Sequence, residues 1–259
     1  FFAGQINGTT GYEEAAAQGL IAGINAAIKK TSNKEFIIDR SQGYIGVLID
    51  DLVTKGTNEP YRMFTSRSEY RLLLRSDNAD QRLTPIGVDI GCVSSYRQKE
   101  FDKKNQKLKD GFGLVKKLFL SPNQLQKKDI KIKLDGKKRS VMQLLSYKNI
   151  NFKKLEKIWP ELIPLEAEVK EQIEIESIYA SYLARQRADI DDFKKEEGLV
   201  IPKKTNFKDV GSLSNEIIEK LTKTRPPTLG AASRISGVTP AAIISIMRFL
   251  KKQKNNKAA

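Results

Sequence analysis

The sequence predicts a mainly α-helical protein, in which the C-terminal edge of an α/β domain precedes an all-helical region. Hydrophobic residues recur at three- and four-residue steps near residues 12–30 and 165–195, as they do along one face of a helix. The opening Phe1-Phe2-Ala3-Gly4 has the character of a buried strand end. The last sixty residues contain further short helical patterns. We therefore expect a strand end at the start of the chain and helices over most of the remainder.

Composition excludes several kinds of chemistry. The 259 residues include 46 Lys and Arg, 31 Asp and Glu, one Cys and no His, for a net charge of +15. Without His, this chain alone can build neither a Ser-His-Asp nor a Cys-His nucleophile system, and it has no imidazole to bind a metal. One Cys excludes an intramolecular disulfide. No apolar run is long enough to span a membrane. Because the chain starts with Phe1 and lacks a signal-peptide pattern, we expect the C-terminal part of a longer polypeptide in a reducing, aqueous compartment.

The positive charge is unevenly distributed. Residues 1–96 hold 10 basic and 11 acidic side chains, whereas residues 97–157 hold 19 and 6. Residues 158–198 are acidic, with 5 basic and 11 acidic side chains, and residues 199–259 are basic again, with 12 and 3. Two basic blocks around an acidic helix favour a polyanionic partner. The alternative is a solvated lysine-rich surface, because 33 of the 46 basic residues are Lys.

The first elements follow from periodicity and turn residues. Residues 12–30 are expected to form a helix, in which Gly19 and Gly23 would permit close approach to a neighbouring element. Residues 31–42 are polar and typical of a loop. Residues 44–54 predict a short apolar element, either helix or strand, that ends before Gly56.

An arginine-rich run follows at residues 60–75. Ser66 followed by Glu69 predicts a capping box that opens a helix. Arg67, Arg71 and Arg75 would then lie on one helical face.

The remaining elements are mostly helical. Residues 77–80 predict a turn, and Thr84-Pro85 predicts an N-cap with Pro at the first helical position. Residues 129–135 alternate weakly, with a possible hairpin turn at Asp135-Gly136. The expected helices span about residues 94–120, 140–147, 152–159, 165–195, 213–223, 228–235 and 239–252. Between the last two, Gly237 and Thr239 predict a tight corner with Thr239 as N-cap, which suits either core packing or a DNA-binding helix-turn-helix.

The start of the chain carries the clearest chemical signal. Phe1-Phe2-Ala3-Gly4-Gln5-Ile6-Asn7-Gly8-Thr9-Thr10-Gly11-Tyr12-Glu13-Glu14 combines a strand end, a glycine-rich polar loop and a helix start. Such a junction presents unpaired backbone N–H groups and the positive end of the helix dipole. It suits an electron-rich ligand atom, such as a phosphate or a flavin oxygen. The alternative is a tight turn that merely requires Gly.

This stretch resembles the last FAD-contacting segment of the MnmG/GidA family, the large subunit of the enzyme that modifies the wobble uridine of tRNA. The resemblance runs through the whole chain and is weakest at residues 97–160. Other family-like stretches are residues 46–52, 60–75, 77–80, 211–216 and 232–243.

The resemblance implies where domains and cofactor contacts lie. Residues 1–40 would form the last strand end, loop and helix of a Rossmann-type FAD-binding domain. An arginine-rich connection (41–95), a basic then acidic long-helix subdomain (96–197) and a compact three-helix module (198–259) would follow. Gln5 matches the family's FAD-contacting Gln, and its neighbours are weaker candidates for the same role: Gly4, Asn7, Gly8, Thr9, Gly11, Tyr12 and Glu13. No catalytic or metal-ligating residue is assigned within this chain.

The resemblance also implies an activity and partners. Members of the family use FAD, reduced by NADH, and methylene-tetrahydrofolate as one-carbon donor to install an aminomethyl or carboxymethylaminomethyl group on carbon 5 of the wobble uridine. A GTPase, MnmE, is the partner, and a homodimer within a heterotetramer in the bacterial cytoplasm is expected, with no membrane or DNA contact. The last sixty residues would dock the GTPase. The competing hypothesis is a non-catalytic helical module that binds RNA or docks a partner.

RNA contacts are expected from two groups of basic residues. The arginine run could grip phosphates and stack on bases, pair with Asp77, Asp80 and the Glu-rich helix, or face the flavin. Cys92 could act as a nucleophile, but its apolar surroundings in sequence favour a small buried residue. The predicted RNA-binding residues are Arg62, Arg67, Arg71, Arg75, Lys103, Lys104 and Lys107.

Overall fold

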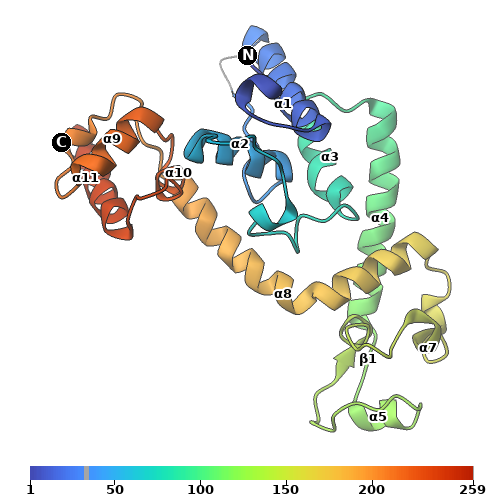
Figure 1. Cartoon of the computed structure of the whole chain (residues 1–259). Helices are drawn as coiled ribbons and strands as arrows, with labels where there is room; N and C mark the ends of the chain where they lie inside the picture. The colour runs from blue at the N-terminus through green and yellow to red at the C-terminus, as the bar shows by residue number, and fades with distance from the viewer. Residues whose placement is uncertain (32–34, 259) are drawn as a thin grey trace. The chain divides into compact units, whose positions relative to one another are not determined.

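The computed structural model describes residues 1–31 and 35–258, and over these residues the protein is mainly α-helical, as predicted (Figure 1). Contacts divide the chain into two compact units. The first unit combines residues 1–71 with residues 186–259, and the second holds residues 72–185. This division differs from the four segments expected from the sequence, whose boundaries stay predictions.

The N-terminal part of the first unit consists of a loop and two helices. The 3-10 turn η1 (Gln5–Asn7) leads into α1 (Tyr12–Thr31), which confirms the first predicted helix. The ambiguous segment after it is a helix, α2 (Tyr44–Lys55). Gly46 lets α2 lie against the preceding segment, because a Cβ there would lie 2.1 Å from the carbonyl oxygen of Asp39. The expected close approach at Gly19 and Gly23 is wrong for the described residues, since no neighbouring atom lies within 4 Å of a Cβ built at either.

The C-terminal part of the first unit is a small helical bundle. It follows α8 (Ala167–Glu197) and holds η4 (Phe207–Asp209), α9 (Asn215–Thr224), α10 (Leu229–Ser233) and α11 (Pro240–Ala258). Leu221, Leu229 and Ile246 are fully buried at its centre. The Thr239 hydroxyl oxygen accepts a hydrogen bond from the backbone N–H of Ala242, which confirms the predicted N-cap. Gly237 turns the chain before it with a φ of +88°.

The second unit combines short elements with two long helices, α4 (Ser95–Lys117) and the first part of α8. Its other elements are α3 (Ala79–Asp89), β1 (Phe119–Leu120), α5 (Pro122–Gln126), β2 (Arg139–Ser140), α6 (Val141–Leu144), α7 (Phe152–Glu156) and η3 (Pro160–Leu162). Val115, Leu144 and Leu155 are fully buried in its core. Ser121 and Ser140 open α5 and α6 with complete capping boxes. The long basic and acidic helices and the short helices near residues 140 and 152 are confirmed.

The expected buried strand end at the start of the chain is not observed, because residues 1–4 form no strand and Phe1 and Phe2 are exposed. The structure also overturns three other local predictions. The arginine run is not a helix: η2 (Thr65–Arg67) is a single turn, and Glu69 binds a buried Arg instead of capping a helix. Thr84 is not an N-cap, because α3 begins at Ala79 and Pro85 lies inside it; the Thr84 hydroxyl instead donates to the Asp80 carboxylate.

The third overturned prediction is the hairpin strand at residues 129–135. The antiparallel pair forms outside it, with Phe119 opposite Ser140 and Leu120 opposite Arg139. The residues between these two short strands form α5 and turns, and one of the turns contains Gly136 at a φ of +72°.

Within residues 1–31 and 35–258, no helix has both the length and the apolar character needed to cross a membrane. Over the same residues, no group of three or more His, Cys, Asp or Glu side chains is arranged to hold a metal ion.

Two glycine substitutions in neighbouring helices should have opposite effects on stability. Gly46→Ala places a methyl group against the backbone of Asp39, and such overpacking costs about 1–3 kcal/mol, so the melting temperature should fall. Gly19→Ala adds a helix-favouring residue in open space and should stabilise α1 by about 0.5–1 kcal/mol. Thermal denaturation followed by far-UV circular dichroism measures both. Equal melting temperatures for the two variants would contradict the packing of α2 described above.

Candidate functional site

The loop between the chain start and α1 is closed on itself by backbone hydrogen bonds. The N–H of Asn7 donates to the carbonyl of Gly4 at 3.0 Å, and the N–H of Gly8 donates to the carbonyl of Gln5 at 2.9 Å. Gly4 and Gly8 have φ values of +84° and +78°, a conformation that favours Gly. The glycines of the motif therefore shape a tight turn, while the side chain of Gln5 is left exposed.

Gln18 on α1 holds this loop through side-chain hydrogen bonds. The sequence did not indicate this role. The amide oxygen of Gln18 accepts from the N–H of Gly4 at 3.2 Å and from the Asn7 side chain at 2.6 Å. Its amide nitrogen donates to the Thr9 hydroxyl at 2.9 Å and to the carbonyl of Glu14 at 3.2 Å. Gln18 is 5 % exposed. All of its amide's hydrogen-bonding groups are thus engaged in holding the loop on α1.

A second segment, around Tyr61, holds the other side of the loop. The N–H of Tyr61 donates to the carbonyl of Gly8 at 2.7 Å, and the N–H of Thr10 donates to the carbonyl of Tyr61 at 2.9 Å. Glu14 accepts from the N–H of Met63 at 2.7 Å through one carboxylate oxygen. The loop is therefore clamped between α1 and residues 61–63, so that it presents one fixed surface.

The presented surface suits an electron-rich ligand. The first-turn N–H groups of a helix have no intrahelical partner, and in α1 they belong to Tyr12, Glu13 and Glu14. Tyr12 is 94 % exposed, and Glu13 is also exposed. Among the described residues, the second carboxylate oxygen of the buried Glu14 has no hydrogen-bond partner. Acidic side chains at this helix start disfavour a free phosphate there and fit a neutral, carbonyl-bearing ring better.

The clamp is continuous with a buried charge cluster around Arg40. The Tyr61 hydroxyl donates to Asp51 at 2.9 Å, and Asp51 accepts from Arg40 at 2.7 Å. Arg40 is 2 % exposed. Its guanidinium also donates to Asp50 at 3.0 Å and to Glu69 at 2.7 Å. The remaining donors reach the backbone carbonyls of Val47 and Arg67.

Local turn geometry points Arg40 inward. The carboxylate of Asp39 accepts from the N–H of Ser41 at 2.7 Å and from its hydroxyl at 2.6 Å, and the N–H of Asp39 donates to the Gln42 side chain. This polar turn was expected only as a loop.

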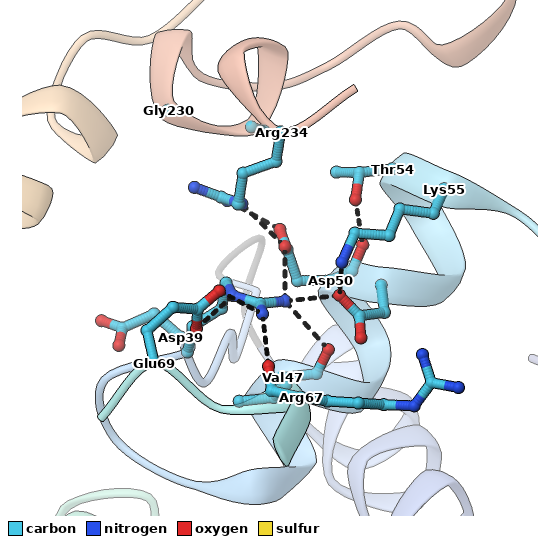
Figure 2. Close-up of polar contacts among 12 residues, drawn as sticks. Asp39, Val47, Asp50, Thr54, Lys55, Arg67, Glu69, Gly230 and Arg234 are labelled. Carbon is cyan, nitrogen blue, oxygen red and sulfur yellow. Dashed lines mark hydrogen bonds and ion pairs between the residues drawn. The ribbon is translucent and has the colours of Figure 1, made fainter. Parts of the chain in front are cut away.

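Figure 2 shows that Arg234, the residue directly after α10, reaches the same cluster through Asp50. The two contacts are 2.8 and 2.7 Å long and form a bidentate pair. Arg234 also pairs with Glu197 at 2.7 Å and lies over the Phe193 ring. The C-terminal bundle is thereby joined to α2 within the first unit.

The pKa shifts of Asp51, Tyr61 and Arg40 each favour the charge state that the group ordinarily has at neutral pH. Burial alone would raise the pKa of Asp51, but hydrogen bonds from Lys55 and Arg40 outweigh it and lower that pKa below its ordinary value. Burial and the hydrogen bond to Asp51 raise the pKa of the Tyr61 hydroxyl. Burial opposes the charge of Arg40, but its carboxylate partners raise its pKa. The cluster therefore positions backbone and side chains.

The predicted RNA-binding arginines lie in different environments. Arg62 and Arg71 are exposed. Arg67 is half-buried, with its guanidinium 4.4 Å from the centre of the Tyr61 ring and its Nε donating to the carbonyl of Arg62. In the second unit, Arg75 binds Asp77 and Glu176 and lies over Tyr179. Arg75 thus follows the intramolecular alternative considered for this run.

The predicted RNA-binding lysines on α4 face acidic side chains. Lys103, Lys104 and Lys107 line a hollow of about 520 Å³ in the second unit. Lys103 pairs with Glu100 at 2.8 Å and Lys107 pairs with Glu166 at 2.6 Å. The same hollow is also lined by Asp77, Glu168 and Glu171.

The expectation that Cys92 is buried is wrong. Cys92 is exposed because α3 ends at Asp89 and Gly91, with a φ of +77°, turns the chain outward before it. Its apolar neighbours in the sequence therefore do not enclose it.

Fold and loop together define a class of protein: a mainly helical region that follows a glycine-rich loop opening an α-helix. Three family models match the chain. They are described as Glucose inhibited division protein A (residues 1–34), tRNA modifying enzyme MnmG/GidA C-terminal helical domain (95–187) and tRNA modifying enzyme MnmG/GidA C-terminal helical bundle (189–259).

Relatives and solved structures agree with these matches. Two proteins named tRNA uridine 5-carboxymethylaminomethyl modification enzyme MnmG, from Granulibacter bethesdensis and Caldicellulosiruptor saccharolyticus, are each 47 % identical over 98 % of this chain. A structure of Aquifex aeolicus GidA is 39 % identical with a TM-score of 0.83 over 96 % of this chain. A second crystal form of it is 38 % identical with a TM-score of 0.81. The chain belongs to the MnmG/GidA family, and it spans about 40 % of the length of these relatives.

The lowered pKa of the buried Asp51 carboxylate predicts that the folded protein loses stability as the pH falls. Because the pKa of Asp51 is lowered in the folded protein, its stabilising contribution is present above its unfolded value of about 3.9 and is lost as pH falls through the folded value. Asp51→Asn should therefore lower the melting temperature at neutral pH, and the gap to the unmodified protein should narrow below about pH 4. Melting curves across this pH range measure it. A gap that is independent of pH would show that the Asp51 charge contributes nothing.

Proposed function

We propose that this chain is part of an FAD-dependent enzyme that, together with a GTPase, modifies carbon 5 of the wobble uridine of certain tRNAs. The clamped loop of residues 4–14 is the observation that carries the proposal. The names of the relatives support the tRNA substrate and the carboxymethylaminomethyl product. The chain's own residues would supply one edge of the cofactor site.

The residues of the loop fit a flavin ring edge. Gln5 is exposed at the turn and carries an amide that can donate to a ring carbonyl. The N–H groups of Tyr12 and Glu13 open α1 beside it. The other candidate residues of the loop shape its backbone, and in this proposal their side chains do not contact the flavin ring. These residues are Gly4, Asn7, Gly8, Thr9 and Gly11. Gln18 is a positioning residue, because it acts on the loop and not on the ligand.

Bound FAD supplies the redox chemistry, with NADH as reductant and methylene-tetrahydrofolate as one-carbon donor. The residues of the loop described above would hold and orient the bound flavin. The enzyme would be a homodimer within a heterotetramer that includes MnmE, in the bacterial cytoplasm.

The C-terminal bundle is proposed to dock the GTPase. It leaves Ile244 46 % exposed on α11, which gives a partner an apolar contact. Because Arg234 of the same bundle binds Asp50 on α2, removing residues 199–259 would also disturb the cluster beside the cofactor loop. A deletion therefore cannot separate docking from flavin binding.

Flavin binding by the full-length protein tests the proposal. The purified protein should carry FAD, and Gln5→Ala should weaken it. Gln18→Glu keeps the acceptor for Gly4 but loses the amide donors to Thr9 and Glu14, so it should weaken FAD binding about tenfold or more. Fluorescence titration of the apoprotein with FAD measures these constants.

Asn25→Ala is the matched control. Asn25 is another amide on α1, seven residues after Gln18, and its side chain bonds the backbone of Phe36 instead of the loop of residues 4–14. It should lower thermal stability without changing FAD affinity. If the full-length protein binds no flavin, the proposal is contradicted. The competing hypothesis, a non-catalytic RNA-binding or docking module, is then favoured.

A further inference from the structure

We propose that a lysine-lined hollow in the second unit binds the sugar-phosphate backbone of RNA. The hollow has a volume of about 410 Å³ and lies between the turn that ends α5 and the residues around α7. The identity of the RNA as tRNA rests on the proposed function, whereas the site itself rests on the charges and geometry below. The lining residues are Lys128, Asp129, Ile130, Lys131, Asn149, Ile150, Lys154, Lys157 and Ile158.

The surrounding segment carries a strong excess of positive charge. Residues 121–157 contain 11 basic and 3 acidic side chains. Two of those acids are already paired, Asp135 with Arg139 at 2.6 Å and Glu156 with Lys170 at 2.7 Å. Among the lining residues Asp129 is therefore the one acid that faces four lysines. Such a field attracts a polyanion and speeds its encounter.

The hollow differs in charge from the one lined by Lys103, Lys104 and Lys107. That hollow is also lined by Glu100 of α4 and by Glu168 and Glu171 of α8. Glu100 and Glu166, the residue before α8, pair with two of its lysines. A phosphate entering it would meet carboxylates as well as ammonium groups. Because of these acids, we expect the second unit to contact RNA at the hollow near α5 and α7, and not at the lysines in the middle of α4.

The lysines of the proposed site project from anchored backbone. The N–H groups of Lys128 and Ile130 both donate to the carbonyl of Leu125, at 2.9 and 3.0 Å, and Leu125 is fully buried. The Asn151 side chain caps α7 by accepting from the N–H of Lys154 at 3.2 Å. Lys154 in turn donates its Nζ to the carbonyl of Asn149. The backbone that carries Lys128 and Lys154 is therefore preformed, and less ordering of the chain is needed when a ligand binds.

A neighbouring hollow favours RNA over an acidic protein as the occupant. It shares Ile150, has a volume of about 320 Å³, and its lining includes Tyr147, Lys148 and one acid, Glu174. One carboxylate oxygen of Glu174 accepts a hydrogen bond from the N–H of Phe152 at 3.1 Å. Tyr147 is 38 % exposed, so its ring is available to stack on a base. Phosphate-binding lysines beside an accessible aromatic ring are typical of surfaces that bind single-stranded or looped RNA.

Charge-removing variants of the full-length protein test the site. Lys128, Lys131 and Lys157 are exposed, so the triple Lys→Gln variant at these positions should fold normally. Its affinity for an unmodified tRNA transcript should fall about tenfold or more, and the log–log slope of affinity against salt should become shallower by about 2. The matched control removes the same charge at exposed Lys99, Lys109 and Lys117 on α4, which do not line the hollow. The control should change the affinity less than about threefold.

The outcomes separate the possible explanations. Equal losses in the two variants would mean that only overall charge matters, and no loss in the first would mean that the hollow does not bind RNA; either result overturns the proposal. Poly-glutamate that competes for the hollow as well as tRNA does would overturn RNA in favour of an acidic protein. If the unmodified protein lacks flavin and modifies no tRNA but the first variant alone loses RNA affinity, the proposed function fails and the site is supported.

Discussion

The first unit depends on one buried guanidinium. Arg40 is almost completely removed from water, and burying an unpaired charge costs several kcal/mol. The cost is offset because Asp50, Asp51 and Glu69 surround it and two backbone carbonyls accept its remaining donors. These partners come from α2 and from the segment at residues 67–69, and Asp50 adds α10 through Arg234. The segments can satisfy this charge only by coming together, so the cluster specifies their arrangement as well as stabilising it.

The same cluster extends to the candidate cofactor loop. Asp51 accepts from Tyr61, and the backbone of Tyr61 exchanges hydrogen bonds with Gly8 and Thr10. Gln18 holds the other side of the loop from α1. The surface proposed to face the flavin is thus determined by residues that never touch it. A contiguous network also runs from the C-terminal bundle, proposed to dock the GTPase, through Arg234 and Asp50 to Arg40.

Sequence reasoning found what local physics determines. Periodicity located α1, α4 and α8, and cap residues such as Thr239 marked helix starts, because these signals act over a few neighbouring residues. It failed at residues 60–75, where the local capping pattern competes with a distant partner: Glu69 binds Arg40, 29 positions away. It also placed Arg40 in an ordinary loop. A buried Arg has no sequence pattern of its own, and only the three-dimensional arrangement of its acidic partners identifies it.

The candidate site shows the same limit. The resemblance singled out Gln5, whose exposed side chain fits a ligand contact, whereas Gln18 looked like one polar position on a helix. The combination of a buried Gln on α1 with a glycine-rich loop just before it was the available signal, since a buried amide must find partners. The basic charge of residues 97–157 was also evident from the sequence, but not which lysines face acids. That depends on the packing of α4 against α8.

Hydrogen–deuterium exchange in an Arg40→Met variant tests most directly whether the buried guanidinium positions the cofactor loop. The N–H groups of Thr10 and Tyr61, both hydrogen-bonded across the clamp, should exchange markedly faster in the variant. The N–H groups of Ile158 and Trp159, bonded to Leu155 within the second unit, should keep their protection. Unchanged exchange at Thr10 and Tyr61 would contradict the account, because the loop would then hold its shape without Arg40.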